Sequence, residues 1–166
     1  DFRIVFHKAV DIADAYLVMI IGVHDQILIE LANKCSFPRG FPILWIPRIK
    51  MQYFGFYPKF ENDDRQIPDE QSEFNDIKSI HFFKKWSGFL GQLMFFTIGD
   101  QKYWTVTSKN SAGKDSPYIE DGQRLFEPFV NQEFIDYMIA NNLHICAEVM
   151  SQRDQVHGSR VYKESP

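Results

Sequence analysis

Two β-forming segments joined by a short turn limit the fold more than any other part of the chain. Residues 91–98 are largely apolar, and residues 103–108 read Tyr-Trp-Thr-Val-Thr-Ser. Branched and aromatic side chains of this kind favour strands. Gly99-Asp100 lies between the two segments and is a glycine followed by a small polar residue, which is typical of a hairpin turn. The sequence therefore predicts an antiparallel β-hairpin here.

Further strands are predicted on both sides of this hairpin. Residues 16–23 form an apolar run that reads as a buried strand, although a helix over residues 11–23 competes with that interpretation. Residues 78–84 and residues 143–150 are predicted strands as well. The remaining predicted strands are short and cover residues 27–31, 38–45 and 49–57, of which the last two have prolines in or near them.

One helix is expected in the second half of the chain. Apolar residues recur at helical spacing over residues 125–140, and Asn141-Asn142 is a good stop signal. Residues 110–117 read as a loop, and the carboxylate-rich residues 61–76 as a solvated loop or a short helix. Strands and helices alternate irregularly, so we expect one α+β domain over residues 1–166, with mainly antiparallel sheets and packed helices.

Charge and hydropathy exclude some classes of function. The 166 residues carry a formal net charge of −4, so the chain as a whole is not a polybasic nucleic-acid binder, although a local basic groove is compatible with this charge. The longest apolar run, residues 15–23, is about half the length that a membrane span needs, and we expect no membrane partner. Cys35 and Cys146 lie far apart in apolar surroundings, which favours reduced core residues over a disulfide or metal site.

Lys85 is the first candidate for a catalytic nucleophile. It lies between two strand-like segments and is followed three residues later by Gly88. A lysine in this position can be held partly desolvated against a ligand, which lowers the pKa of its amine and makes it a nucleophile. The alternative is an ordinary lysine in a surface turn, and the Lys-x-x-Gly pattern alone does not separate the two.

Four other short motifs accompany Lys85 in a fixed order. The five motifs are Arg39-Gly40, Pro58-Lys59-Phe60-Glu61-Asn62, Lys85-Trp86-Ser87-Gly88, Ser108-Lys109-Asn110-Ser111 and Glu148 within an apolar strand. In their order and spacing they resemble the RNA ligases of the phage-type branch and the adenylyltransferase domain of fungal tRNA ligase. The resemblance extends over roughly residues 35–163 and implies a ligase-like nucleotidyltransferase domain.

The chain departs from the family pattern in several places. Ser87 stands where the family usually has Asp or Asn, and Phe89-Leu90-Gly91 looks like a small insertion. Phe60-Glu61-Asn62 replaces the usual Phe-Phe-Asn. The family's later glutamate motif and its paired-lysine motif have no counterpart in these 166 residues. We therefore expect an incomplete domain. Expressed alone, it should bind ATP weakly if at all and should not join RNA strands.

The resemblance implies a defined reaction with ATP and Mg²⁺ as cofactors. The amine of Lys85 attacks the α-phosphorus of ATP, AMP then passes to the 5′-phosphate of an RNA, and a 3′-hydroxyl finally displaces the AMP. Each step moves negative charge at phosphorus, so cations are needed nearby. The resemblance implies that five residues bind the nucleotide, namely Arg39, Lys59, Gly88, Lys109 and Glu148. It implies no direct protein ligand to a metal ion.

Several alternatives remain open at the level of sequence. Ser87 and the missing motifs favour a catalytically inert relative that serves as a binding or assembly module. DNA ligases and mRNA capping enzymes share the nucleophile motif, although Arg39-Gly40 and the segment around Lys59 fit the RNA-ligase branch better. Glu148 can be read as a core carboxylate paired with an arginine, and Lys109 as a solvated charge. If the site is real, Lys85, Lys109 and Glu148 should converge on one cleft, bordered by Arg39 and Lys59.

Overall fold

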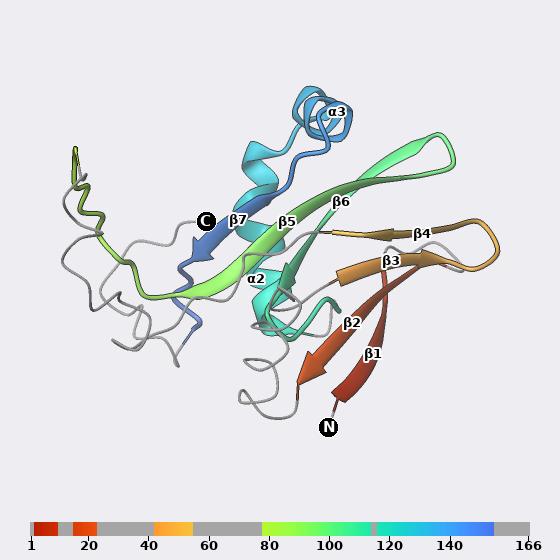
Figure 1. Ribbon diagram of the computed structural model, residues 1–166, viewed down its shortest axis with the longest axis horizontal. Coiled ribbons are helices and arrows are strands. Elements are labelled where there is room, and N and C mark those ends of the chain that lie inside the picture. The colour runs from red at the N-terminus through yellow and green to blue at the C-terminus, as the bar shows by residue number, and fades with distance from the viewer. Residues whose placement is uncertain (1, 10–14, 23–41, 55–77, 114–115, 155–166) are drawn as a thin grey trace.

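The strands form two antiparallel sheets (Figure 1). The computed structural model describes residues 2–9, 15–22, 42–54, 78–113 and 116–154. The N-terminal sheet has the order β1-β2-β3-β4, with β1 Phe2–Lys8, β2 Tyr16–Gly22, β3 Pro42–Ile46 and β4 Lys50–Tyr53. The C-terminal sheet has the order β6-β5-β7, with β5 Phe89–Ile98, β6 Gln101–Ser108 and β7 Ile145–Val149.

Side-chain alternation explains why the N-terminal sheet buries one face. Leu17 and Met19 on β2 are buried, and the paired strand β3 buries Leu44 opposite Leu17. Alternate positions point to the other face, where Phe6 of β1 and Trp45 of β3 make an edge-to-face contact with ring centroids 6.0 Å apart. The buried side chains therefore line one face of the sheet, as the period of two in a strand requires.

The central strand β5 packs both of its faces. Met94 and Phe96 belong to the core cluster that contains Leu17 and Leu44 of the N-terminal sheet. Leu93 and Phe95 belong to a second core cluster, which contains side chains of the two helices. The domain thus has three layers, with the C-terminal sheet between the N-terminal sheet and the helices. The α+β class with mainly antiparallel sheets is confirmed.

The predicted hairpin is confirmed. Ile98 pairs with Gln101, which leaves Gly99 and Asp100 as the two-residue turn. Gly99 has a φ of +60°, a left-handed conformation that glycine adopts without steric cost.

The prediction of one helix over residues 125–140 was wrong. The structure has helix α2 Pro117–Phe126, a short 3₁₀ turn η3 Glu127–Phe129, and helix α3 Gln132–Ala140. Pro128 lacks the N–H that would continue α2, and Asn131 starts a new helix because its side chain accepts a hydrogen bond of 2.8 Å from the Phe134 N–H. The predicted stop is confirmed, since α3 ends at Ala140. Neither α-helix of the described ranges is long and apolar enough to cross a membrane.

The strand predictions had mixed outcomes. Residues 16–22 form strand β2 rather than a helix, residues 42–45 of the predicted strand 38–45 belong to β3, and residues 49–57 and 143–150 contain β4 and β7. The predicted strand over residues 78–84 was wrong, because this segment has no regular secondary structure and is exposed throughout. The neighbouring strand β5 already has β6 and β7 on its two sides. Strand β1 was not predicted, and residues 27–31 lie outside the described ranges.

Candidate functional site

Pairing of β5 with β7 brings Glu148 to the chain segment that follows Lys85. Leu90 lies opposite Glu148 in the register of these two antiparallel strands. The Gly88 N–H donates a hydrogen bond of 3.0 Å to Oε1 of Glu148. Nζ of Lys85 lies 4.0 Å from the same oxygen. The third and fifth motifs, which are far apart in the sequence, therefore meet around one carboxylate.

Gly88 has a steric role in this arrangement. A Cβ atom built on Gly88 would lie 2.2 Å from the carbonyl oxygen of Val149 and 2.8 Å from its carbonyl carbon. Both are backbone atoms of the paired strand, so they cannot turn aside as a flexible side chain does. The glycine of the Lys-x-x-Gly motif therefore allows the backbone before β5 to approach β7 and reach Glu148.

The Lys85 side chain differs from the expected nucleophile in its exposure. It is 85% exposed, whereas the Glu148 side chain is 33% exposed. Nζ of Lys85 also lies 3.5 Å from the carbonyl oxygen of Trp86. The partial desolvation that we expected for this amine is thus not seen in the described residues.

The adjacent lysine has a different environment. Nζ of Lys84 lies over the ring of Trp86, 3.7 Å from its centroid. Of the two consecutive lysines, Lys85 is the one beside Glu148, in keeping with the register of the nucleophile motif.

Lys109 lies at the same end of the C-terminal sheet. Ser108 pairs with Gly91 on β5, and Gly91 pairs with Ala147 on β7, next to Glu148. The Ser108 N–H donates to the carbonyl oxygen of Ser111 at 2.7 Å, which closes a tight loop around the half-buried Lys109. The register thus places Lys109 at the end of the sheet that carries Glu148. Arg39 and Lys59 lie outside the described residues.

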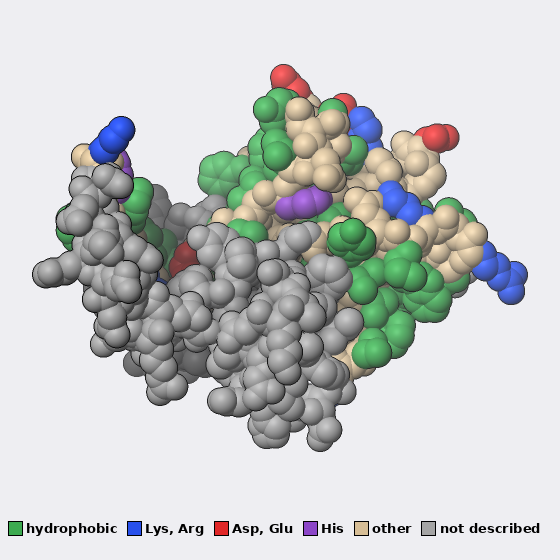
Figure 2. All heavy atoms as spheres, in the orientation of Figure 1, with side chains coloured by type: hydrophobic (Ala, Val, Ile, Leu, Met, Phe, Trp, Pro, Cys, Tyr) green, Lys and Arg blue, Asp and Glu red, His purple; other side chains and the backbone are tan. Residues whose placement is uncertain are grey.

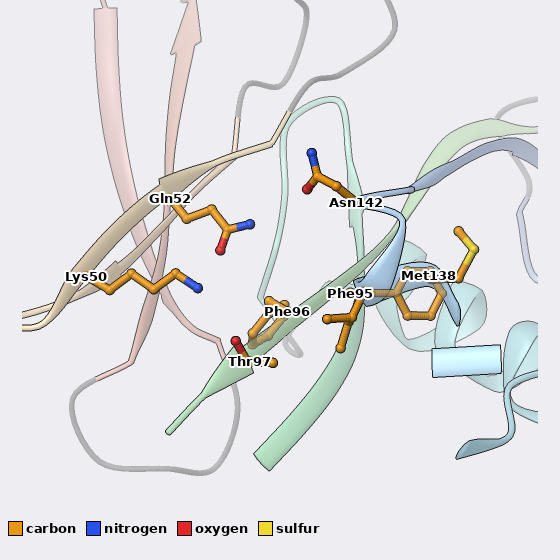
Figure 3. A pocket seen from close by; sticks show the side chains of 8 residues that line it. Lys50, Gln52, Phe95, Phe96, Thr97, Met138 and Asn142 are labelled. Carbon is orange, nitrogen blue, oxygen red and sulfur yellow. The ribbon is translucent and has the colours of Figure 1, made fainter. Parts of the chain in front are cut away.

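One pocket among the described residues lies away from this site (Figure 3). It has a volume of about 190 Å³ and is bounded by β4, β5 and the end of α3. Lys50 and Gln52 reach toward it from β4, and Phe96 and Thr97 from β5. Phe96 is seven positions along β5 from Phe89, so at a rise of about 3.3 Å per residue it lies roughly 23 Å from the start of the strand. The pocket is therefore separate from the Lys85–Glu148 pair.

A buried ion-pair cluster next to β7 was missed by the sequence analysis. Asp121 of α2 is 4% exposed and accepts hydrogen bonds from Ser151 Oγ at 2.5 Å and Arg153 Nε at 2.6 Å. Burial alone would raise the pKa of Asp121, but these hydrogen bonds and the charges of Arg153 and Arg124 hold it below its usual value. The cluster ties α2 to the chain after β7 and is structural. No periodicity or motif in the sequence marks it.

A magnesium ion is compatible with the Glu148 carboxylate beside Lys85. Mg²⁺ is commonly held by one or two carboxylates together with substrate phosphates and water, rather than by a cage of protein ligands. Glu148 supplies such a carboxylate, and only one of its oxygens is used by Gly88 and Lys85. Within the described ranges, no group of three or more His, Cys, Asp or Glu side chains could hold a metal ion by itself.

Comparisons with known proteins identify no relative. No protein-family model matches the chain, and searches of curated proteins and of solved structures found no match. The function must therefore be argued from the residues and their geometry.

Proposed function

We propose that the chain acts as an ATP-dependent, RNA ligase-like nucleotidyltransferase. The observation that carries the proposal is the meeting of Lys85, Gly88 and Glu148, where one carboxylate oxygen lies 3.0 Å from the Gly88 nitrogen and 4.0 Å from the Lys85 amine. The order of the motifs predicts that Lys85, Lys109 and Glu148 converge on one cleft. An antiparallel sheet with a second sheet packed on it also supports the proposal.

The proposed chemistry begins at the amine of Lys85. The amine loses its proton to solvent, to which it is open, and its nitrogen forms a bond to the α-phosphorus of ATP as the bond to the β-phosphate oxygen breaks. Pyrophosphate leaves with the electron pair of that bond, and a Lys85–AMP phosphoramidate remains. Glu148 keeps the amine near the start of β5, and Lys109 provides positive charge at the same end of the sheet. Magnesium, when bound, neutralises charge on the pyrophosphate.

The nucleophile can be tested with α-labelled ATP. The protein, expressed in full from its native gene, is incubated with labelled ATP and Mg²⁺ and separated on a denaturing gel. We expect a covalent AMP adduct that is labile in acid and stable in alkali. Lys85→Ala should abolish the adduct, whereas the matched variant Lys84→Ala should keep most of it. An adduct that survives Lys85→Ala, or that forms with GTP instead of ATP, contradicts the proposal.

Glu148 needs a variant that separates its charge from its structural hydrogen bond. Glu148→Gln keeps an oxygen that can accept from the Gly88 N–H but removes the negative charge. Loss of one preorganised charge contact typically lowers a rate by roughly 10²-fold, and we expect a decrease of that order in adduct formation. The free energy of unfolding should change by less than about 1 kcal/mol. Unchanged adduct formation would mean that Glu148 is only structural.

The exposure of Lys85 favours a second candidate function. An 85% exposed amine resembles a solvated surface lysine more than an activated nucleophile, and Ser87 departs from the family motif. In this candidate the domain is a catalytically inert relative that acts as a binding or assembly module. The labelling experiment separates the two, because an inert module forms no adduct even when isothermal titration detects ATP binding.

A further inference from the structure

The segment before β5 exposes an unusual set of side chains. Residues 78–87 have no regular secondary structure, and Figure 1 shows this yellow-green segment extending away from both sheets. Phe82 is 93% exposed, Phe83 is 87% exposed and Trp86 is 39% exposed. Large aromatic side chains are normally buried, and a group of exposed rings marks a binding surface.

The charges of this segment have one sign. Residues 78–88 contain Lys78, Lys84 and Lys85 and no carboxylate, in a chain whose formal net charge is −4. Glu148 offsets part of this charge at the Lys85 end. All the fully charged side chains within residues 78–88 are therefore lysines, and a phosphate group is the kind of ligand that lysine side chains complement.

The rings and cations are interleaved. The ring of His81 stacks against that of Phe83, with centroids 6.4 Å apart, and Nζ of Lys84 lies over the ring of Trp86. Proteins bind single-stranded nucleic acids with this combination, because bases stack on aromatic rings while lysines contact the phosphates. We propose that residues 78–87 form a stacking surface for single-stranded RNA.

Two other occupants fit the segment less well. Binding in the plane of a membrane typically uses an amphipathic helix, and this segment is not helical. A protein partner that covered the rings would bring three lysines toward the interface core, where charged residues are depleted. The choice of RNA over DNA rests on the proposed function, since the segment contains Lys85. The stacking surface itself rests on the exposed rings.

Fluorescence anisotropy of the whole protein tests the proposal. The probe is a fluorescein-labelled single-stranded RNA of about ten nucleotides, without ATP or Mg²⁺. Stacking on one ring typically changes affinity by about 5- to 150-fold, and Phe82→Ala should weaken binding within this range. Phe82→Leu, which is apolar but not aromatic, should weaken it similarly, whereas Phe82→Trp should retain it. Phe129→Ala is the matched control, because Phe129 is 65% exposed and lies in the 3₁₀ turn, outside residues 78–87.

A second readout guards against indirect effects on folding. Single-stranded RNA should quench part of the tryptophan fluorescence, and Trp86→Phe should remove that part while Trp45 and Trp104 still report the folded state. Equal affinity of the Phe82→Ala variant and the unchanged protein would overturn the proposal. So would binding to anionic phospholipid vesicles that depends on Phe82 when RNA binding does not, or full rescue of RNA binding by Phe82→Leu.

Failure of the proposed stacking surface can be distinguished from failure of the proposed enzyme activity. The Phe82→Ala variant should still form the Lys85–AMP adduct but transfer AMP poorly to the 5′-phosphate of an RNA. If no adduct forms and RNA binding still depends on Phe82, the stacking surface stands and the proposed enzyme activity fails. If the adduct forms and RNA binding does not depend on Phe82, the proposed enzyme activity stands and the stacking surface fails. A preference of this surface for DNA of the same length would contradict the choice of RNA.

Discussion

The candidate site requires glycine at position 88 because the backbone of the neighbouring strand leaves no room for a side chain. The atoms nearest to a Cβ placed on this residue belong to the main chain of Val149, and that main chain is part of the pairing between β5 and β7. Any larger residue must push the two strands apart where Glu148 accepts its hydrogen bond. Stability and site geometry are therefore linked at this one residue.

Substitution of Gly88 should affect both properties. Overpacking of a tight site typically costs about 1–3 kcal/mol, and we expect Gly88→Ala to lower the free energy of unfolding by that amount. It should also reduce the amount of AMP adduct, because the start of β5 moves away from Glu148. Urea denaturation and the labelling gel measure the two effects.

Gly99→Asn provides the matched control for this variant. Nothing lies within 4 Å of a Cβ on Gly99, and asparagine tolerates its positive φ. Its stability should change by about 0.5 kcal/mol or less. A Gly88→Ala protein as stable as this control would show that the close approach to Val149 is not maintained in solution.

The elements that were predicted correctly carry local signals. The hairpin of β5 and β6 follows from turn chemistry and from residues that favour strands, all within one short stretch. The wrong predictions concern choices that depend on the rest of the molecule. Residues 78–84 look like a strand, but pairing also needs an available sheet edge, and β5 has neighbours on both sides. Strand β1 was missed because Arg3, His7 and Lys8 interrupt its apolar residues.

The candidate site was predicted to a similar extent. The resemblance singled out Lys85, Gly88 and Glu148, and the structure brings these three together. The exposure of Lys85 could not be predicted from the sequence, because it depends on the path of the irregular residues 78–87 before β5. The packing of Asp121 against Ser151 and Arg153 was equally beyond the sequence, since it requires knowing that α2 lies beside the end of β7.

His144 joins elements of different layers and should make stability depend on pH. It precedes β7, its Nδ1 accepts a hydrogen bond of 3.3 Å from the Phe95 N–H of β5, and its ring meets the edge of Phe54 after β4. Burial lowers the pKa of His144 below its usual value. The unfolded chain therefore binds a proton at a higher pH than the folded one. The stabilising contribution is present above a pH of about 6.5 and is lost as the pH falls through the lowered folded pKa.

Urea denaturation between about pH 5 and pH 8 tests this expectation. One proton limits the slope to about 1.4 kcal/mol per pH unit, and the partial exposure of His144 reduces it. His144→Asn should flatten the dependence, whereas His81→Asn, which changes an exposed histidine, should preserve it. An equal slope in the two variants would assign the pH dependence to other groups.

At the scale of the whole molecule, the three layers are held together by the C-terminal sheet. Strand β5 supplies Met94 and Phe96 to one core cluster and Leu93 and Phe95 to the other. Figure 2 shows hydrophobic side chains also gathered at the surface near the hairpin of β3 and β4, where Ile49, Met51 and Tyr53 are exposed. The two cores lie on either side of β5, so unfolding of this strand would disrupt both of them.

The two cores should therefore unfold together. Trp45 reports on the N-terminal sheet and Trp104 on the core beneath the helices. Two variants that each keep only one of these tryptophans should show urea transitions with the same midpoint, and far-UV circular dichroism should coincide with both. Separate midpoints would show that the layers are independent folding units and that β5 does not couple them.

The alternation of β5 also restricts how the protein can change over time. Its odd-numbered side chains Leu93 and Phe95 serve one layer, and its even-numbered side chains Met94 and Phe96 serve the other. Point substitutions can therefore adapt one layer while leaving its neighbour untouched. A gain or loss of one residue within the strand has no such freedom, because it would turn every following side chain toward the opposite layer. During evolution the residues of each core can therefore change separately, but the number of residues between them along β5 must stay the same.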